Sequence, residues 1–309
     1  MQIRTCAITV NYQGAEDTAT CVASLRESSV PVSIVVVDNT PNDLALEAAL
    51  SPYPDITLIR APENLGFGRG NNLGIEWVLN YIDCEHIFML NNDATVCPDA
   101  IKQLEAAMSH HPESGIATAR IVTAEDPSRL WYGGGEVDWK RGGGSVPGWL
   151  GASDAPLAMR SRHVTFASGC AMMIRKNILQ ELGGFDARYF MYEEDLELSL
   201  RIQNLGWKIW YESTAVIHHI VQGSQNRGRA FVGRYDPDNP NLAFLVYHGM
   251  KNSLLNAHLH AKGKDKFIFR MFFPLVVLRR VFQWAIHGRI DALKSLVRAL
   301  HDYQVEKQW

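Results

Sequence analysis

Residues 6–39 read CAITVNYQGAEDTATCVASLRESSVPVSIVVVDN and contain the unit on which the fold depends. The runs CAITV (6–10) and SIVVVDN (33–39) are short and rich in β-branched residues, and a helical pattern, DTATCVASLRES (17–28), lies between them. SIVVVDN is nearly continuously apolar up to its last two residues, which is typical of a strand buried on both faces of a parallel sheet. The stretch therefore predicts a β-α-β unit.

The same alternation continues along the chain. It predicts strands at 56–61, 86–93 and 114–122 and helices at 43–50, 70–82 and 98–110, the last with Pro98 in its first turn. A glycine- and tryptophan-rich stretch (131–153) then predicts a long loop or an irregular hairpin. Regular patterns resume with strands at 166–175, 208–211 and 215–220 and helices at 176–184 and 193–206. This rhythm predicts a doubly wound α/β sheet with helices on both faces.

Composition limits the class of protein. The chain has 309 residues, of which 47% are hydrophobic and 20% charged, as in a folded, soluble protein with one large α/β domain or a domain plus an appendage. Five scattered cysteines without a C-x-x-C pair argue against a disulfide framework or a zinc-thiolate site and favour a reducing compartment. The N-terminal apolar run is too short for a signal peptide and is interpreted as the first strand.

Charge is distributed unevenly. Residues 251–309 contain eleven Lys/Arg and four Asp/Glu, whereas residues 1–250 contain nineteen and twenty-nine. The basic tail includes FIFRMFFPLVVLRRVFQW (267–284), whose longest charge-free run, 271–278, is far shorter than the roughly 18 residues that span a bilayer. Aromatic and basic residues together fit a helix lying in the interface of an anionic membrane. A helix packed on the body or in a dimer contact explains the segment equally well.

Polar residues end four successive predicted strands. They lie in NYQG (11–14), at Asp38 and Asn39, in PENLGFGRGNNLG (62–74), and at Asn91, Asn92 and Asp93. Ligands bind beyond the carboxyl ends of the strands in sheets of this kind, so we expect a site at this edge. The glycines of GFGRGNNLG follow the third strand, not the first, which argues against a dinucleotide-binding fingerprint. They are interpreted as allowing the backbone to approach a ligand, with Asn64, Arg69 and Asn71 as hydrogen-bond donors.

A metal site is one interpretation of the polar residues after the fourth strand. A divalent cation that binds with a nucleoside diphosphate needs only one or two carboxylates, and Asp93 could supply one. An ordinary turn or helix cap before Pro98 is the alternative. His218 and His219 end a later strand, and because adjacent strand residues point to opposite faces, at most one of them readily joins Asp93.

Three consecutive acids follow an aromatic run in RYFMYEEDLELSLR (188–201). Leucines and isoleucine form one apolar stripe of the predicted helix, Gly206 ends it, and the acids occupy its first turn, where the helix dipole favours carboxylates. A solvated helix start explains Glu193 and Glu197. It does not explain the preceding YFMY, which should bury the turn. An ionised but poorly hydrated acid there suits a general base.

In order, the chain contains VNY (10–12), VVVDN (35–39), ENLGFGRGNNLG (63–74), LNNDA (90–94), SGCAMMIRK (168–176), LGGFDARYFMYEEDLELSLRIQNLGWK (182–208) and VIHHIVQGS (216–224). Together these stretches resemble the family-2 inverting glycosyltransferases of the A-type fold, within them the bacterial rhamnosyltransferase-like group. The resemblance implies a Rossmann-like nucleotide-diphospho-sugar transferase fold with a mostly parallel central sheet. It also implies a catalytic domain at 1–247 (a nucleotide-sugar half, 1–125, and an acceptor-binding and catalytic half, 126–247), followed by a basic amphipathic helical extension, 248–309.

The resemblance also implies roles for individual residues. Asp195 is expected to be the catalytic base, with Glu194 holding it or binding the acceptor. Asp93 and His219 are expected to bind Mg²⁺ or Mn²⁺, with His218 as the reserve ligand; Asn91 stands where many members have Asp. Arg201 is expected to pair with an acid or a phosphate. The sugar donor is expected to contact Val10, Tyr12, Asp38, Asn64, Gly66, Arg69, Asn71, Asn91 and Asn92, and the acceptor Trp139, Trp149 and Tyr192.

The expected activity is transfer of a sugar from a nucleotide donor to a glycan or lipid-linked acceptor of a bacterial surface polysaccharide. dTDP-L-rhamnose is the first choice of donor and a UDP-hexose the second. The enzyme is expected in the cytoplasm or peripherally bound to the inner face of the membrane. No nucleic acid partner is expected, and a homodimer is an option. A catalytically inactive binding module is the alternative, against which Asp38, Asp93, Asp195 and His219 argue. A nucleotidyltransferase would carry a basic Gly-rich loop after its first strand, which NYQGAEDT lacks.

Overall fold

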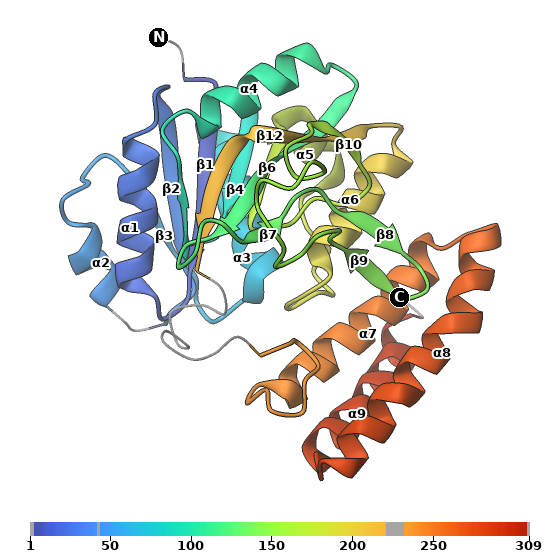
Figure 1. The fold of residues 1–309 in the computed structure, drawn as a ribbon. Helices are drawn as coiled ribbons and strands as arrows, with labels where there is room; N and C mark the ends of the chain where they lie inside the picture. The colour runs from blue at the N-terminus through green and yellow to red at the C-terminus, as the bar shows by residue number, and fades with distance from the viewer. Residues whose placement is uncertain (1–2, 42–43, 221–231, 308–309) are drawn as a thin grey trace.

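The computed structural model describes residues 3–41, 44–220 and 232–307 (Figure 1). The first part of the chain alternates strands and helices as predicted. It consists of β1 (Thr5–Asn11), α1 (Ala15–Arg26), β2 (Val32–Asp38), α2 (Ala45–Leu50), β3 (Thr57–Arg60), α3 (Gly66–Tyr81) and β4 (His86–Leu90). Every residue of β4 and the last five of β2 are buried. Because successive strand residues point to opposite faces, both faces of the sheet are covered here.

The second part of the chain is less regular. It consists of β5 (Ala94–Val96), α4 (Ala100–His110), β6 (Ser114–Thr123), β7 (Leu130–Tyr132), β8 (Glu136–Asp138), β9 (Gly143–Ser145), β10 (Arg162–Val164), β11 (Ala171–Arg175), α5 (Lys176–Leu182), α6 (Glu194–Asn204) and β12 (Lys208–His219). The glycine-rich stretch contains an antiparallel hairpin, β8–β9. Three helices follow: α7 (Leu242–His260), α8 (Gly263–Ile286) and α9 (Ile290–Glu306).

The central sheet is mostly parallel, as predicted. Its order is β10-β12-β6-β11-β4-β1-β2-β3, with β5 added to β12 and β7 to β6. Strands β1, β2, β3 and β4 pair in parallel, as do β6 and β12, whereas β11 runs antiparallel between β4 and β6. The carboxyl ends of the parallel strands and the amino end of β11 therefore lie at one edge. That edge positions the candidate site.

Several local predictions differ from the structure. The strand predicted at 166–175 is confined to Ala171–Arg175, and the helix predicted at 70–82 begins at Gly66. Helix α4 begins at Ala100, so Pro98 precedes the helix and is not in its first turn. The two strands predicted at 208–211 and 215–220 are one strand, β12, which is irregular between Glu212 and Val216 where its register against β6 shifts. An extra stretch of residues in one strand bends the ladder without ending it. In the sequence pattern this irregular stretch resembles a loop, which is why two strands were predicted.

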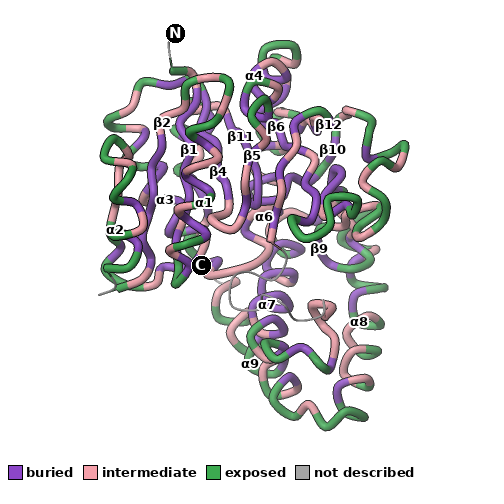
Figure 2. Tube along the Cα trace, turned by 60° about the vertical axis from the view of Figure 1, so that its left-hand side comes forward, coloured by how far each residue is buried: buried purple, intermediate pink, exposed green. Residues whose placement is uncertain are grey.

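The C-terminal helices have a core of their own. It joins buried residues of α7, α8 and α9 with Trp139, separate from the large core around the sheet. Figure 2 shows α7 largely buried, whereas most of α8 is exposed or intermediate. The boundary expected between residues 247 and 248 falls inside α7, which also contacts α6. Within the described residues, no helix has the combination of length and apolar character that would let it cross a bilayer.

Candidate functional site

A cavity of about 1000 Å³ opens at the edge of the sheet identified above. Residues from segments far apart in the sequence line it: Asn91 and Asp93 after β4, Glu194 and Asp195 at the start of α6, and His219 at the end of β12. The parallel strand order brings the first and last of these segments to the same edge. The structure thus brings together the residues predicted for metal binding and for catalysis.

Asp93 and His219 form a buried pair. His219 Nε2 lies 3.2 Å from Asp93 Oδ1, and both side chains are largely shielded from solvent. Antiparallel pairing of β12 with β5 places His219 opposite Ala94, next to Asp93, and the Ile220 N–H donates to the Asp93 carbonyl (2.9 Å). His218 lies on the other face of the strand, with Nδ1 3.9 Å from Cys97 Sγ.

The pair fits a divalent cation. His219 Nδ1 is buried and makes no hydrogen bond within the described part of the chain, and the buried Asp93 Oδ1 has the His219 imidazole beside it. Buried polar atoms in native proteins are normally satisfied, so a buried ring nitrogen without a partner, next to a carboxylate in a cavity, indicates a candidate metal site. One carboxylate and one imidazole leave the other coordination positions open to water and phosphate oxygens, which is how such ions are bound with nucleotides.

The turn before α6 has an unusual backbone. Tyr192 and Glu193 both have φ of 68°, in the left-handed region of the backbone that residues other than glycine rarely adopt. Two asparagines of α7 hold this turn: Asn252 Nδ2 donates to the carbonyls of Met191 (3.0 Å) and Tyr192 (2.7 Å), and Asn256 Nδ2 donates to that of Glu193 (3.2 Å). Strained residues persist where the surroundings over-determine them. Helix α7 therefore fixes the direction in which the acids point.

Glu194 and Asp195 are two adjacent carboxyls with little access to water. Asp195 accepts hydrogen bonds from the Gly169 N–H at Oδ2 (3.0 Å) and from the Leu196 N–H at Oδ1 (2.8 Å), whereas Glu194 Oε2 has no partner among the described residues. Burial raises the pKa of Asp195, although these backbone donors oppose the change. Burial, and next the charge of Asp195, raise the pKa of Glu194 well above its usual value. A carboxylate in this state readily takes up a proton.

Glu193 faces the same cavity and pairs with Arg234, whose Nη1 lies 3.0 Å from Glu193 Oε1. Burial raises the pKa of Glu193, and Arg234 opposes this. Arg234 Nε and Nη2 are shielded from water and make no hydrogen bond within the described residues, and the guanidinium lies 4.4 Å from the centre of the Tyr192 ring. Two unused donors on a fixed cation suit an anion. Sequence reasoning missed Arg234; the only signal was a run of arginines at 227, 229 and 234 after the histidine strand.

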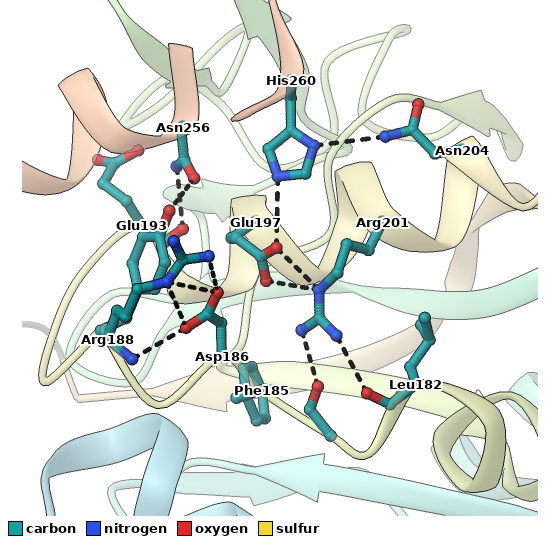
Figure 3. A network of polar contacts seen from close by, with 12 residues as sticks. Leu182, Phe185, Asp186, Arg188, Glu193, Glu197, Arg201, Asn204, Asn256 and His260 are labelled. Atoms are coloured by element: carbon teal, nitrogen blue, oxygen red, sulfur yellow. Dashed lines mark hydrogen bonds and ion pairs between the residues drawn. The ribbon is translucent and has the colours of Figure 1, made fainter. Parts of the chain in front are cut away.

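The predicted solvated helix start is wrong for Glu193 and Glu197. Glu197 is buried, and both of its carboxylate oxygens accept the single Nε–H of Arg201 (2.8 and 2.9 Å), while His260 Nε2 of α7 lies 3.3 Å away (Figure 3). Arg201 Nη2 also donates to the Gly184 carbonyl (2.7 Å). The pairing expected for Arg201 with an acid is confirmed. Glu197 is covered because α7 packs against α6, and the Glu193 carboxylate is covered by Arg234; the helix pattern alone contains neither contact.

Most residues predicted to contact the nucleotide lie outside the lining of this cavity, and their side chains have partners in the protein. Asp38 accepts from Asn11 Nδ2 (2.9 Å), Asn71 Nδ2 donates to the Phe67 carbonyl (3.0 Å), and Asn92 Nδ2 donates to Thr18 Oγ1 (3.0 Å). The contacts of Asp38 and Asn92 lie just at or after strand ends, and that of Asn71 lies in the first turns of α3, all near the edge at which a nucleotide is expected.

The other members of that set are more peripheral. Arg69 is partly exposed, 3.7 Å from Glu63, while Val10 is half-buried and Tyr12 exposed. Asn64 Oδ1 accepts from the Gly66 N–H (3.0 Å) at the start of α3. Their role in binding a nucleotide stays a prediction.

Gly66 has a structural reason to be glycine. Its φ is +76°, and a Cβ at this position would lie 2.1 Å from the carbonyl oxygen of Phe190. The next residue, Phe67, donates its N–H to the same carbonyl (3.0 Å). The backbone at Gly66 was expected to approach a ligand. It instead approaches the Phe190 carbonyl, in the main chain just before the acidic turn.

The predicted acceptor aromatics divide into two groups. Trp149 and Tyr192 line the cavity, together with Trp131. Trp139 does not: it is only 9% exposed and packs edge-on against Phe269 of α8, in the core of the C-terminal helices. Residues 221–224 of the stretch 216–224 lie outside the described residues.

Comparison with known proteins agrees with this arrangement. Residues 6–183 match the family model for glycosyl transferase family 2. The chain is 28% identical over 235 residues to N-acetylglucosaminyl-diphospho-decaprenol L-rhamnosyltransferase of Mycobacterium tuberculosis, covering 69% of this chain and 75% of the relative. It is 26% identical over 194 residues to the low-salt glycan biosynthesis hexosyltransferase Agl10 of Haloferax volcanii, covering 63% and 60%.

Solved structures show the same fold at low sequence identity. Residues 1–349 of S. aureus TarS in complex with UDP-GlcNAc superpose with a TM-score of 0.59 at 14% identity, covering 97% of this chain and 80% of that one. GalNAc-T7 with UDP, GalNAc and Mn²⁺ gives 0.58 at 15% identity, with this chain spanning 54% of its length. The predicted A-type fold with a mostly parallel sheet and a helical C-terminal region is confirmed. The chain belongs to glycosyl transferase family 2 and is a glycosyltransferase.

Proposed function

We propose that this glycosyltransferase moves L-rhamnose from dTDP-L-rhamnose to a hydroxyl of a glycan or lipid-linked acceptor during synthesis of a bacterial surface polysaccharide, inverting the anomeric carbon. The choice of sugar is supported by the relative that is named an L-rhamnosyltransferase acting on a diphospho-decaprenol, of which this chain covers 75%. A UDP-hexose is the second candidate, since TarS of the same fold was solved with UDP-GlcNAc.

The observation that carries the proposal is the position of Asp195. It is a poorly solvated carboxylate, its pKa is raised by burial, and it lies in the same cavity as the Asp93–His219 pair. A general base works best with a pKa close to the working pH, and burial moves a carboxylate in that direction. The two backbone N–H groups that bind its oxygens fix its orientation.

The proposed reaction is one displacement. An acceptor hydroxyl gives its proton to a free lone pair of Asp195 while its oxygen forms a bond to the anomeric carbon. The bond from that carbon to the diphosphate oxygen breaks, and the nucleoside diphosphate leaves with the electron pair. Attack opposite the leaving group inverts the configuration. Glu194, adjacent and without a partner in the described residues, is proposed to orient the acceptor hydroxyl.

Asp93 and His219 are proposed to hold Mg²⁺ or Mn²⁺, and Asn91 beside them offers an uncharged contact to the donor. Such an ion supplies charge neutralisation for the departing diphosphate. Arg234 is proposed to bind the donor or acceptor phosphate through its two unused donors, Nε and Nη2. Trp149 and Tyr192 offer aromatic faces to the acceptor sugar.

Helix α8 is proposed to dock on an anionic membrane where a lipid-linked acceptor resides. Six large apolar side chains on it, spaced three or four residues apart, are each more than half exposed: Phe267, Met271, Leu275, Leu278, Phe282 and Ile286. This set is called the α8 stripe. Soluble monomers rarely leave so long an apolar surface uncovered. Lys264, Lys266, Arg270, Arg279 and Arg280 on the same helix supply the charge that anionic headgroups attract.

The test combines binding with turnover. Calorimetric titration with dTDP, UDP and GDP, each with and without Mn²⁺, identifies the nucleotide, and the matching sugar nucleotide is then used as donor. We expect Asp195→Asn to lower kcat by about 10²–10⁴-fold, the usual contribution of a general base, and to leave the Kd of the nucleoside diphosphate within about twofold. Asp265→Asn, an exposed acid in the first turn of α8, is the matched control and should be as active as the wild type.

Two results would contradict the proposal. Near-normal turnover of Asp195→Asn removes Asp195 as the base. Failure of all three nucleotides to bind, with or without the metal ion, favours the inactive binding module instead.

A further inference from the structure

Three metal-ligating side chains lie together away from the catalytic cavity. His111 and Glu113 flank the turn between α4 and β6, and His163 is the central residue of β10. Glu113 Oε1 lies 3.6 Å from His111 Nδ1 and 3.2 Å from His163 Nε2. One ligand atom from each of the three residues lies within 4.8 Å of the others. None of the three lines the catalytic cavity.

Trp210 of β12 holds the two imidazoles. The His111 ring stacks on the indole at 3.5 Å between centroids and 21° between planes, and the His163 ring meets it edge-on at 5.0 Å. His163 is paired with Trp210 across the antiparallel β10–β12 ladder, and Trp210 Nε1 donates to Glu212 Oε2 (3.1 Å). Sheet register and ring packing thus fix both rings before any ion binds.

The spacing matches a tetrahedral metal ion. Zn–N and Zn–O bonds of about 2.0–2.2 Å place neighbouring ligand atoms of a tetrahedron about 3.3 Å apart, close to the two separations from Glu113. Two imidazoles and one carboxylate are ligands that Zn²⁺ and similar transition ions accept, unlike Mg²⁺, which prefers oxygen. All three side chains are partly exposed, so an ion has a path of entry and water can take the fourth position.

We propose that His111, Glu113 and His163 form a second metal site, which binds Zn²⁺ or a similar transition-metal ion outside the catalytic cavity. The ion ties β10, a three-residue edge strand, to the turn between α4 and β6. Short edge strands have few ladder hydrogen bonds of their own, so a cross-link at this point stabilises the edge of the sheet. Its role is structural and does not depend on the activity proposed for the cavity.

Metal binding is measured on the full chain in the Asp93→Ala background, so that the Asp93–His219 pair does not contribute. We expect one Zn²⁺ per chain by equilibrium dialysis, and we expect Co²⁺ to bind with visible absorption and to quench Trp210 fluorescence. His163→Gln should weaken Zn²⁺ binding at least tenfold and remove the rise in Tm that Zn²⁺ causes. His287→Gln, an exposed histidine in the loop after α8, should bind as the parent does.

Quenching of Trp210 fluorescence by bound Co²⁺ shows that the ion lies next to Trp210. Trp210→Phe keeps a ring beneath His111 and should lose the quenching while still binding Co²⁺. The proposal is overturned if His163→Gln, folded by circular dichroism, binds Zn²⁺ with the same stoichiometry and affinity as its parent. It is also overturned if Zn²⁺ does not bind to the Asp93→Ala protein at all.

Discussion

Replacing Glu194 with glutamine is expected to stabilise the folded protein at neutral and alkaline pH. Burial and the charge of Asp195 raise the pKa of Glu194 well above its usual value near 4.5. As pH rises above that usual value, the unfolded chain gives up its proton first while the folded protein retains it. The free energy of unfolding therefore falls with increasing pH until the folded-state pKa is passed. Glutamine removes this dependence because it does not titrate.

The size of the effect follows from the pKa shift. Each unit by which folding raises the pKa costs about 1.4 kcal/mol at a pH above both values. The substitution loses no hydrogen bond at Oε2, which has no partner among the described residues. We therefore expect a gain on the order of 1 kcal/mol at pH 8, or roughly 2–4 °C in Tm for a large domain. The gain should disappear near pH 4.

Urea unfolding followed by tryptophan fluorescence, from pH 4 to pH 8.5, measures this difference. Glu197→Gln is the matched control, three residues further along α6. It breaks a buried pair with Arg201 and His260 and should destabilise the protein by about 3–5 kcal/mol. The reasoning is refuted if Glu194→Gln is less stable than the wild type at pH 8, or if its advantage does not grow between pH 4 and pH 8.

Three further predictions concern the metal pair, the α8 stripe and the turn before α6. Asp93→Ala should abolish the part of the affinity for nucleoside diphosphate that depends on Mn²⁺, measured by calorimetry. Leu278→Glu should reduce binding to anionic vesicles at least tenfold in sedimentation assays, since it places a charge on the exposed stripe. Gly66→Ala should lower the free energy of unfolding by about 2 kcal/mol or more, because a positive φ and a 2.1 Å approach to the Phe190 carbonyl leave no room for a methyl group.

Each of these has a result that would count against it. Donor affinity with equal values in the presence and absence of Mn²⁺ in the wild type would remove Asp93 as a ligand. Vesicle binding that survives Leu278→Glu would place the membrane contact elsewhere on the surface or favour a dimer. Unchanged stability of Gly66→Ala would mean that the start of α3 can move away from Phe190 at little cost. Gly183→Ala separates backbone strain from steric overlap, because Gly183 has a positive φ but its added methyl group would meet no described atom within 4 Å.

The first half of the fold could be predicted because its information is local. Short apolar runs such as 33–39 and 86–93 identify strands, and their alternation with helical patterns predicts that the strands are parallel. The antiparallel insertion of β11 between β4 and β6 is not local, since both of its partner strands lie elsewhere in the sequence. Nothing in the AMMIR pattern states its direction.

The site was predictable to the extent that strand ends define it. The placement of Asp93 near His219 follows from two strands ending at one edge. Strand alternation shows that only one of the adjacent histidines joins Asp93, and the family resemblance identifies it as His219. Trp139 and Arg234 could not be placed in this way. Trp139 packs against Phe269 of α8 and so lies outside the cavity, and Arg234 contacts Glu193, 41 residues away in the sequence. Neither contact is set by the register of paired strands, so the strand pattern does not predict it.

The turn of Tyr192 and Glu193 connects the proposed membrane contact of α8 to the proposed catalytic base, Asp195. Its carbonyls are held by Asn252 and Asn256 of α7, and α7 in turn packs on α9, which contacts α8. If the α8 stripe docks on a bilayer as proposed, the bilayer contacts the same group of helices whose α7 holds the turn before Asp195. A chain shortened within α7 would lose the asparagines that hold this turn, so loss of activity after truncation would not test the proposed membrane contact. Lipid composition should instead set the catalytic rate as well as the location of the intact chain.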